Sequence, residues 1–225
     1  MRRFVLALCL CWTALGQTVP LEEVVRSGQP AAGVPGATYA ENGLAPLGVA
    51  NNGHVFFQAR LNGVDQSADT GIFVWSSGIT RLALREGRPL PEVCPDCVVG
   101  AVRVARLDDS GRVMASVDAR SGDAVVANAV VREAAPGDLR LLAFTGGPAP
   151  LREGETITTT DFAMDMAPDG TSVLLASTSD GSAPSQIVYV IDDVGSRILT
   201  EDGVPSLAQP EWIYRNFFAA SGIQL

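Results

Sequence analysis

The chain has 225 residues and a formal net charge of −9, with 25 acidic residues against 16 basic residues that are all arginine. This balance argues against non-specific nucleic-acid binding, which depends on basic side chains that neutralise phosphates. The mean hydropathy is +0.20, and Val, Leu, Ile and Ala occur mostly in short runs. Such runs favour many short strands over long helices.

The N-terminus predicts an export signal over residues 1–16. Two arginines are followed by an apolar run at residues 4–14, and small residues precede a cleavage point after Gly16. The run is shorter than the roughly 20 residues that span a bilayer, and no later run is apolar enough to do so. We therefore expect a secreted or periplasmic protein without a transmembrane segment, whose residues 17–225 form one repeat domain.

A Gly-x-Pro tripeptide recurs four times along the chain. Its prolines follow one another at intervals of 59, 59 and 57 residues: Pro30, Pro89, Pro148 and Pro205. A recurrence this regular indicates a repeat architecture, in which each period is one supersecondary unit packed on its neighbours. Because proline cannot donate to a strand ladder, we expect each tripeptide to end a unit.

Within each period, a turn that contains glycine comes before a strand with alternating apolar residues. The turns lie at Asn52-Gly53, Ser110-Gly111 and Asp169-Gly170. After the first two turns, apolar residues alternate with other residues over 55–61 and 113–119. Such alternation predicts a strand that is buried on one face.

Further apolar strands follow in each period, and glycine turns separate them. The second strands are expected at residues 71–75, 129–131 and 187–190. The third strands are expected at residues 80–84, 139–144 and 197–200. Another strand ahead of the first glycine turn brings the number per period to four, as at residues 101–107 and 161–166. Short glycine turns between apolar runs indicate antiparallel hairpins.

Four antiparallel strands per period are typical of a β-propeller blade, although blade repeats are usually about 40–50 residues long. We therefore expect an all-β, β-propeller-like array of about three four-stranded antiparallel blades, with a β-sandwich as the alternative. Partial blades are expected at both ends, at residues 21–26 and 222–225. The partial blades could share one closing blade, a homodimer could complete the ring, or the chain could be the front of a longer propeller.

Residues 167–200 resemble the TolB-type propeller repeat. The matching features are the Pro168-Asp169-Gly170 turn, the apolar strand after it, the Ile187-Val188-Tyr189-Val190 strand and the Arg197-Ile198-Leu199-Thr200 ending. The Gly-x-Pro endings and the Gly71-Ile72-Phe73-Val74 strand are similar to repeats in exported bacterial propeller-like proteins of uncharacterised function. The resemblance implies a propeller fold and transfers no catalytic residue.

One motif, Cys94-Pro95-Asp96-Cys97, pairs two cysteines at close spacing. A redox-active pair is expected at a helix start in a βαβ context, which the surrounding strand pattern lacks. A zinc site needs about four ligands, and the chain has one histidine. We therefore expect a local disulfide that clips a loop between two repeats of an exported protein.

Other polar residues carry weaker signals. His54, the sole histidine, is expected at a strand edge, and no Gly-x-Ser-x-Gly elbow accompanies it. The acidic turns are expected to be solvated and to accept local backbone N–H groups, with calcium as the alternative: Asp108-Asp109, Asp165 with Asp169, and Asp192-Asp193. Residues 152–155 are expected to form an exposed loop, and no other cofactor is predicted.

Four aromatic residues lie close together near the C-terminus: Trp212, Tyr214, Phe217 and Phe218. They are candidates for a protein or carbohydrate interface, or for packing between the last units. The first functional interpretation is a binding or scaffolding protein without a catalytic site. The alternatives are a glycan-active hydrolase or lyase that uses carboxylates at the propeller axis, and a truncated relic of a longer exported propeller.

Overall fold

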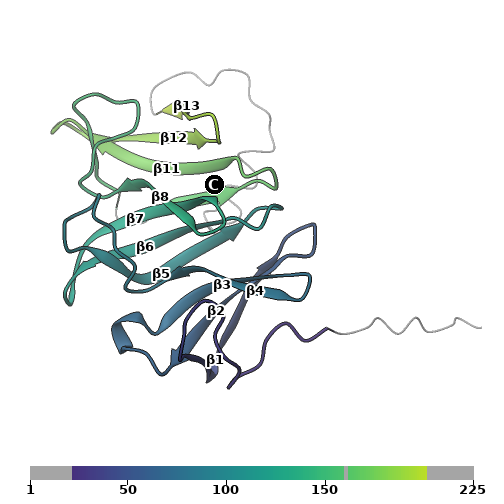
Figure 1. The fold of residues 1–225 in the computed structure, drawn as a ribbon. Helices are drawn as coiled ribbons and strands as arrows, with labels where there is room; N and C mark the ends of the chain where they lie inside the picture. Colours follow the sequence, from purple (N-terminus) through teal and green to yellow (C-terminus); the bar gives the residue numbers. More distant parts are fainter. Residues whose placement is uncertain (1–21, 160–161, 202–225) are drawn as a thin grey trace, which may run out of the picture.

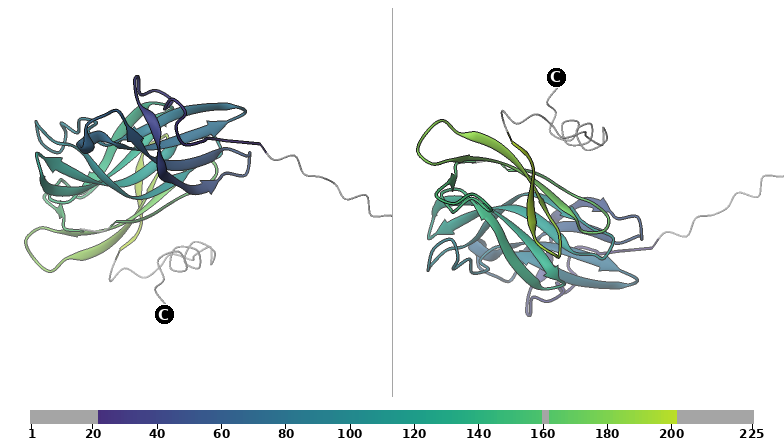
Figure 2. Two further views of the ribbon diagram at one scale, coloured as in Figure 1. Left: turned by 90° about the horizontal axis from the view of Figure 1, so that it is seen from below. Right: turned by 90° about the horizontal axis from the view of Figure 1, so that it is seen from above.

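The computed structural model describes residues 22–159 and 162–201, and in this part the chain is all-β. Its strands form three antiparallel sheets, which we call A, B and C and which follow one another along the chain. Figure 1 shows the three sheets as a stack with sheet B in the middle, and the two views in Figure 2 show the same succession. Within the described residues, no helix is long and apolar enough to cross a membrane.

Each sheet is a meander of four strands in chain order. Sheet A consists of β1 (Thr38–Val49), β2 (Val55–Asn62), β3 (Thr70–Ser76) and β4 (Ile79–Arg85). Sheet B consists of β5 (Val98–Leu107), β6 (Val113–Ser121), β7 (Ala124–Ala135) and β8 (Asp138–Phe144). Sheet C consists of β10 (Ala163–Met166), β11 (Ser172–Ser179), β12 (Ser185–Ile191) and β13 (Ser196–Glu201), and the short β9 (Thr156–Ile157) pairs with β11.

The meander gives every sheet two different ends. The turns between the first and second strands, and between the third and fourth, lie at what we call the turn end. The turns between the second and third strands lie at the opposite, connector end, together with the links from one sheet to the next. Strand β5 contacts both β1 and β10, so the first strands of neighbouring sheets lie next to one another.

The Gly-x-Pro tripeptides form the starts of these links. The N–H of Gly87 donates to the carbonyl of Val99 at 2.8 Å, and Pro89 forms an isolated bridge with Val98. Gly87 has a φ of +79°, which favours glycine because a side chain is strained there. The tripeptides at Gly87 and Gly146 therefore follow the last strand of one sheet and pair with the first residues of the segment that leads into the next.

The segment before β1 and the two links between sheets each contain a four-residue turn. In each turn the N–H of the fourth residue donates to the carbonyl of the first residue. The three turns span residues 34–37, 94–97 and 152–155, with N···O distances of 3.2, 3.0 and 3.3 Å. Their first and last residues are Val34 and Ala37, Cys94 and Cys97, and Arg152 and Glu155. The backbone of the link thus repeats while the side chains that close it differ.

Two apolar cores join the sheets. Residues such as Ile72 and Leu84 of sheet A pack with Val113 and Val117 of sheet B. On the other face of sheet B, Met114 packs in a cluster with residues of sheet C that include Leu174, Ile187 and Tyr189. A third cluster joins the outer face of sheet A to the segment before β1 and contains Tyr39, Phe57 and Phe73.

This arrangement corrects one expectation about β6. Alternation over residues 113–119 predicted a strand with one buried face, but all seven residues of that stretch are buried. Met114, Ser116 and Asp118 alternate with the apolar set and are no more than 6% exposed. The reason is that sheet B lies between two other sheets, so both of its faces are covered.

Candidate functional site

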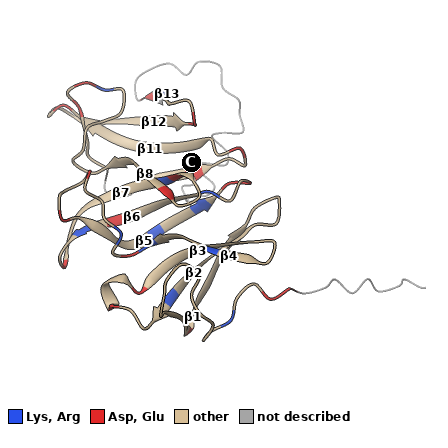
Figure 3. Ribbon diagram, viewed as in Figure 1, with Lys and Arg blue, Asp and Glu red and all other residues tan. Residues whose placement is uncertain are grey.

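A polar cleft opens between sheets A and B at the connector end. Its volume is about 640 Å³, and it is bounded by the β2–β3 loop, the residue after β4, the start of β5 and the β6–β7 turn. Five charged residues from these segments line it: Arg60, Asp69, Glu86, Arg120 and Asp123. Figure 3 shows that acidic residues gather in the loops at the ends of the sheets, with arginines on the strands between them.

Asp69 is held firmly in the sheet A wall. It is 8% exposed, and its carboxylate accepts hydrogen bonds from Arg60 Nε at 2.8 Å and from Thr70 Oγ1 at 3.1 Å. Its backbone carbonyl accepts from the N–H of Leu61 at 2.6 Å. The 3₁₀ turn η1 (Gln66–Ala68) leads into this position, and Arg85 Nε donates to the carbonyl of Ala68 at 2.8 Å. The carboxylate of Asp69 is therefore fixed and already paired.

Glu86 stands directly after β4 and extends its ladder, because its N–H donates to the carbonyl of Thr70 at 3.0 Å. Burial raises the pKa of the Glu86 carboxyl, and the nearby charge of Asp69 raises it further. The Thr70 hydroxyl and the charge of Arg120 act in the opposite direction without reversing the shift. Glu86 thus keeps its proton to a higher pH than an ordinary glutamate does.

Arg120 forms part of the sheet B wall. Its side chain crosses Gly100 so closely that a Cβ on Gly100 would lie 2.7 Å from Arg120 Cδ. The Nε atom is buried, and no hydrogen-bond partner for it exists in the described part of the chain. Glycine at position 100 therefore leaves the space in which the Arg120 side chain packs against the wall. The Nε–H of Arg120 remains a donor without an acceptor among the described residues.

The Cys94–Cys97 loop braces this same wall. The structure joins the two cysteines in a disulfide, with their Cα atoms 5.0 Å apart. Cys97 directly precedes Val98, which lines the cleft. Asp96, between the cysteines, accepts a hydrogen bond from Ser121 Oγ at 2.6 Å, next to the cleft residues of the β6–β7 turn. The loop therefore ties the two sheet B segments of the wall together.

The cleft offers donors and acceptors from both sheets but no metal site. Across residues 22–159 and 162–201, no group of three or more His, Cys, Asp or Glu side chains is arranged to hold a metal ion. Guanidinium and carboxyl groups can hydrogen-bond to the hydroxyls of a small polar molecule. The cavity volume lies within the range of about 300–1,000 Å³ that is usual for small-molecule sites.

The acidic turns were predicted to be solvated, and one of their acids, Asp108, is buried instead. Asp108 is fully buried, and its carboxylate accepts from Arg112 Nε at 2.7 Å and from the Arg112 N–H at 2.8 Å. Asp193 of sheet C binds two arginines of sheet B, Arg112 at 2.9 Å and Arg132 at 2.7 Å. The expectation was wrong for Asp108, which arginine pairing buries, whereas Asp193 is exposed and links sheets B and C through its arginines.

His54 and its turn also join two sheets. The N–H of Asn51 donates to Asp109 Oδ1 at 3.0 Å, and the His54 ring lies 3.1 Å from where a Cβ on Gly111 would be. The ring is half-buried, and His54 directly precedes β2, which agrees with the expected position at a strand edge. Its part in the fold is therefore contact between neighbouring turns.

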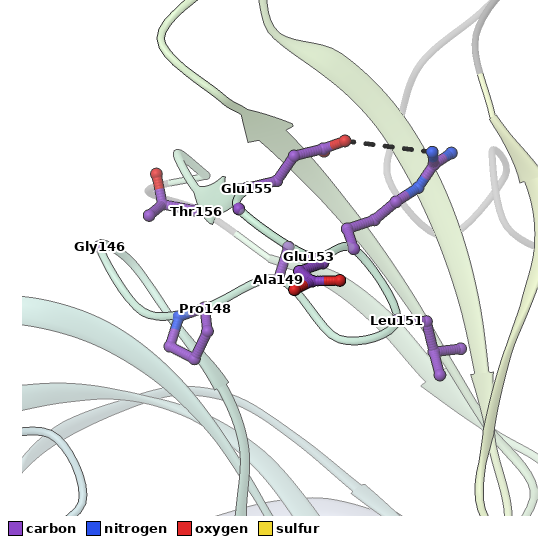
Figure 4. Close-up of a pocket in the computed structure, with 9 residues that line it drawn as sticks. Gly146, Pro148, Ala149, Leu151, Glu153, Glu155 and Thr156 are labelled. Atoms are coloured by element: carbon purple, nitrogen blue, oxygen red, sulfur yellow. Dashed lines mark ion pairs between the residues drawn. The ribbon is translucent and has the colours of Figure 1, made fainter.

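The loop around residues 146–156 encloses a hollow of about 770 Å³ (Figure 4). Glu155 pairs with Arg152 at 4.0 Å, drawn as the dashed line, and it accepts a hydrogen bond from the Thr178 hydroxyl. Arg152 also pairs with Glu201. The prediction of an exposed loop holds for Glu153 but not for Arg152 and Glu155, which are half-buried.

The cleft residues Asp69, Glu86 and Arg120 were not among the candidates from the sequence. A signal for them existed in the repeat itself. At the same phase of the next unit, Ala127 stands in place of Asp69 and Thr145 in place of Glu86. Asp69 thus differs in charge from its counterpart in the next unit, whereas an acidic residue precedes the Gly-x-Pro glycine in two units, as Glu86 and as Asp202. Four earlier candidates, Trp212, Tyr214, Phe217 and Phe218, lie outside the described residues, as do the export signal and Pro205.

A family model described as a family of unknown function, DUF7453, matches residues 11–200. No curated protein and no solved structure matches the chain.

Proposed function

Since the chain belongs to DUF7453, a family of unknown function, we propose its role from the geometry of the cleft. The protein is a non-enzymatic, exported binding protein, and its ligand is a small saccharide or similar polyhydroxylated molecule. The ligand occupies the cleft between sheets A and B. The proposal rests on one observation, the convergence of polar side chains from four separate segments on a single cavity.

Two of these groups, Arg120 and Glu86, can form hydrogen bonds with a ligand. The buried Nε of Arg120 lacks an acceptor among the described residues, and an unmet buried donor costs about 1–3 kcal/mol. A ligand oxygen that accepts from it recovers this free energy. The carboxyl group of Glu86, which lines the same cavity, hydrogen-bonds to a ligand hydroxyl. The binding energy thus comes from groups that the fold leaves partly unsatisfied.

We also propose a propeller-like arrangement of the TolB type. Three four-stranded meanders in chain order and the contacts of β5 with both β1 and β10 support it. Completion of the ring by a homodimer is part of this proposal. Sedimentation of the full chain tests it, because a stable monomer at micromolar concentration would overturn the homodimer.

Export is supported by the disulfide between Cys94 and Cys97, since disulfides persist in oxidising compartments such as the periplasm and the cell exterior. Mass spectrometry of the protein recovered from the exported fraction tests this directly. A mature chain that begins at Gln17 is the expected result.

A second candidate is glycoside hydrolysis, because Asp69 and Glu86 place two carboxyl groups in one cavity. A raised pKa suits a general acid, and a paired carboxylate suits the second role in such enzymes. These two groups lie beside the β2–β3 loop and after the fourth strand, rather than on the first strands at the axis of the array.

Calorimetric titration of the full chain with a panel of neutral mono- and disaccharides tests the main proposal. At least one should bind, and Arg120→Ala should weaken that binding about tenfold or more, the value of one charge-assisted hydrogen bond. Arg26→Ala removes an exposed arginine that does not line the cleft and is the matched control. Absence of binding across the panel, or equal weakening by both variants, would overturn the proposal. Release of reducing sugar that is lost in Glu86→Gln would establish the hydrolase instead.

A further inference from the structure

A second cavity, of about 390 Å³, lies between sheets B and C at the turn end, away from the cleft described above. Sheet B contributes Arg132, Arg140 and Leu142 to its lining, and sheet C contributes Ile191, Asp192 and Asp193. No function was assigned to these residues from the sequence beyond an acidic turn. The strand register shows that one of them, Arg132, differs in charge from the residues at the same position in the other two sheets.

Arginines stand at the same register position on the fourth strand of all three sheets. Arg81 pairs across the ladder with Val74, and Arg197 pairs with Val190. In sheet B the corresponding arginine, Arg140, is opposite another arginine, Arg132. Like charges directly opposite one another on neighbouring strands are destabilising, so an arginine pair in place of an arginine and a valine calls for a compensating anion.

At the junction between sheets A and B, the arginine of the fourth strand is paired with a carboxylate of the neighbouring sheet. Arg81 forms a two-point pair with the buried carboxylate of Glu133, at 2.7 and 2.8 Å. Glu133 is opposite Leu139 in the ladder of sheet B, and the corresponding place in sheet C, opposite Ser196, belongs to Ile191. Arg140 therefore faces an apolar residue where Arg81 faces a carboxylate.

Both arginines can form further hydrogen bonds or ion pairs. Arg132 is 5% exposed, and its Nε has no hydrogen-bond partner among the residues that the structure describes. Arg140 has one partner, Asp138, at 3.3 Å, and both side chains are more than half exposed. Exposed pairs of this kind contribute only about 0–1 kcal/mol, so a ligand can take the place of Asp138.

The acids at the cavity are already neutralised. Asp193 accepts from Arg112 and from Arg132 Nη2, and the hydrogen bond from Arg112 lowers the pKa of Asp193. Asp192 accepts from the N–H groups of Val194 and Gly195 and pairs with Arg197 at 2.8 Å. Both carboxylates are thus held in ion pairs with arginines, which reduces their repulsion of an incoming anion.

We propose that this cavity binds a small aliphatic carboxylate, whose carboxylate group pairs with Arg140 and Arg132 as Glu133 pairs with Arg81. The hydrocarbon part of the ligand packs against Leu142 and Ile191. This site is independent of the saccharide cleft, since the two lie at opposite ends of the sheets. Either can therefore fail in experiment without the other.

Butyrate is a suitable probe, and the arginine Nε–H resonances of the ¹⁵N-labelled full chain are the readout. We expect a saturable shift of the Arg132 signal and an increase in thermal stability on addition of butyrate. Arg140→Ala, which removes an exposed side chain, should weaken binding about tenfold or more. Arg26→Ala, an equally exposed arginine with one acidic partner, should leave binding unchanged.

The second test adds a carboxylate to the site, through Ile191→Glu, instead of removing an arginine. It places a carboxylate where sheet B has Glu133, so it should fill the site and abolish butyrate binding in a folded protein. A wild-type protein that shows no saturable shift would overturn the proposal, as would an Arg140→Ala protein that binds as well as wild type. Inorganic phosphate that binds as tightly as butyrate would overturn the aliphatic carboxylate in favour of a general anion site.

Discussion

The junction between sheets A and B and the junction between sheets B and C use the same backbone and close at different ends. At the turn end, Arg81 and buried Glu133 seal the first junction, whereas Arg140 faces Ile191 across a cavity in the second. At the connector end the two junctions also differ in side chains. Glu86 lines an open cleft in the first junction, and its counterpart Thr145 donates to Asn128 and Thr159 carbonyls in the second.

The difference teaches that a repeat can keep its strands and turns while single side chains decide whether a junction is sealed or hollow. Ile191 lines the cavity at the second turn end, where the first has buried Glu133, and Glu86 lines the cleft at the first connector end, where the second has Thr145. Function in this architecture is therefore to be sought where units differ, and stability where they agree.

The largest expected effect comes from breaking the sealed turn end. Glu133 is fully buried and accepts four hydrogen bonds, two from Arg81 and one each from the N–H groups of Val113 and Gly137. Glu133→Ala leaves Arg81 without its partner, so we expect the free energy of unfolding to fall by about 3–5 kcal/mol. Urea denaturation measures this change.

The matched control is Asp138→Ala, which removes an exposed carboxylate from Arg140. That variant should lose no more than about 1 kcal/mol. Equal free energies of unfolding for Glu133→Ala and Asp138→Ala would contradict the stabilising role of the Arg81–Glu133 pair at the first junction.

A smaller effect is expected at the connector end of the first junction. Replacing both Cys94 and Cys97 with alanine opens a short loop, and the chain-entropy model gives a loss of about 2 kcal/mol. Wild-type protein denatured with a reductant present should show a similar loss. Native protein should contain no reactive thiol in this loop, and two reactive thiols would contradict the disulfide.

A change of opposite sign is expected in the core of the second junction. Tyr189 is fully buried, and its hydroxyl has no hydrogen-bond partner within the described part of the chain. Tyr189→Phe removes this unmet group, so the free energy of unfolding should rise by about 1 kcal/mol. Thermal denaturation measures the gain.

Tyr39 supplies the comparison for that variant, because its hydroxyl accepts a hydrogen bond from the N–H of Ala32 at 3.2 Å. Tyr39→Phe should therefore lower the stability by about 1 kcal/mol. Two changes of the same sign would show that the Tyr189 hydroxyl is satisfied.

The smallest effect concerns the pH dependence of the open cleft. Since the folded-state pKa of Glu86 is raised, the folded protein holds this proton more tightly than the unfolded chain does. Its contribution to stability is present below the ordinary glutamate pKa and is lost as pH rises through the raised value. Glu86→Gln should thus gain stability over wild type towards neutral pH and show no such gain in acid.

Urea denaturation at several pH values tests this, with the exposed Glu92→Gln as the charge-matched control. A difference between Glu86→Gln and wild type that stays constant over the whole pH range would contradict the raised pKa.

Much of the fold could be predicted from glycine and proline. The turns at Gly53, Gly111 and Gly170 and the Gly-x-Pro links located the strands, because these positions need backbone conformations that other residues disfavour. The burial of β6 on both faces could not be predicted, since alternation within one strand says nothing of a third sheet on its other side.

The two cavities were harder to foresee for a geometric reason. Bulges interrupt the ladders between the third and fourth strands of all three sheets. Counting residues from one Gly-x-Pro to the next therefore does not place Val74, Arg132 and Val190 opposite their arginines. Only the strand register reveals that Arg132 is the exception, and only the stacking of sheets reveals what faces it.

The three links between units respond to different conditions, although their backbones are alike. One turn is closed by Val34 and Ala37, the next by a disulfide, and the third by the Arg152–Glu155 ion pair. A reductant can open only the second of these closures. The chain thus repeats one backbone turn with three different side-chain closures, and of the three only the disulfide depends on the redox state of the surroundings.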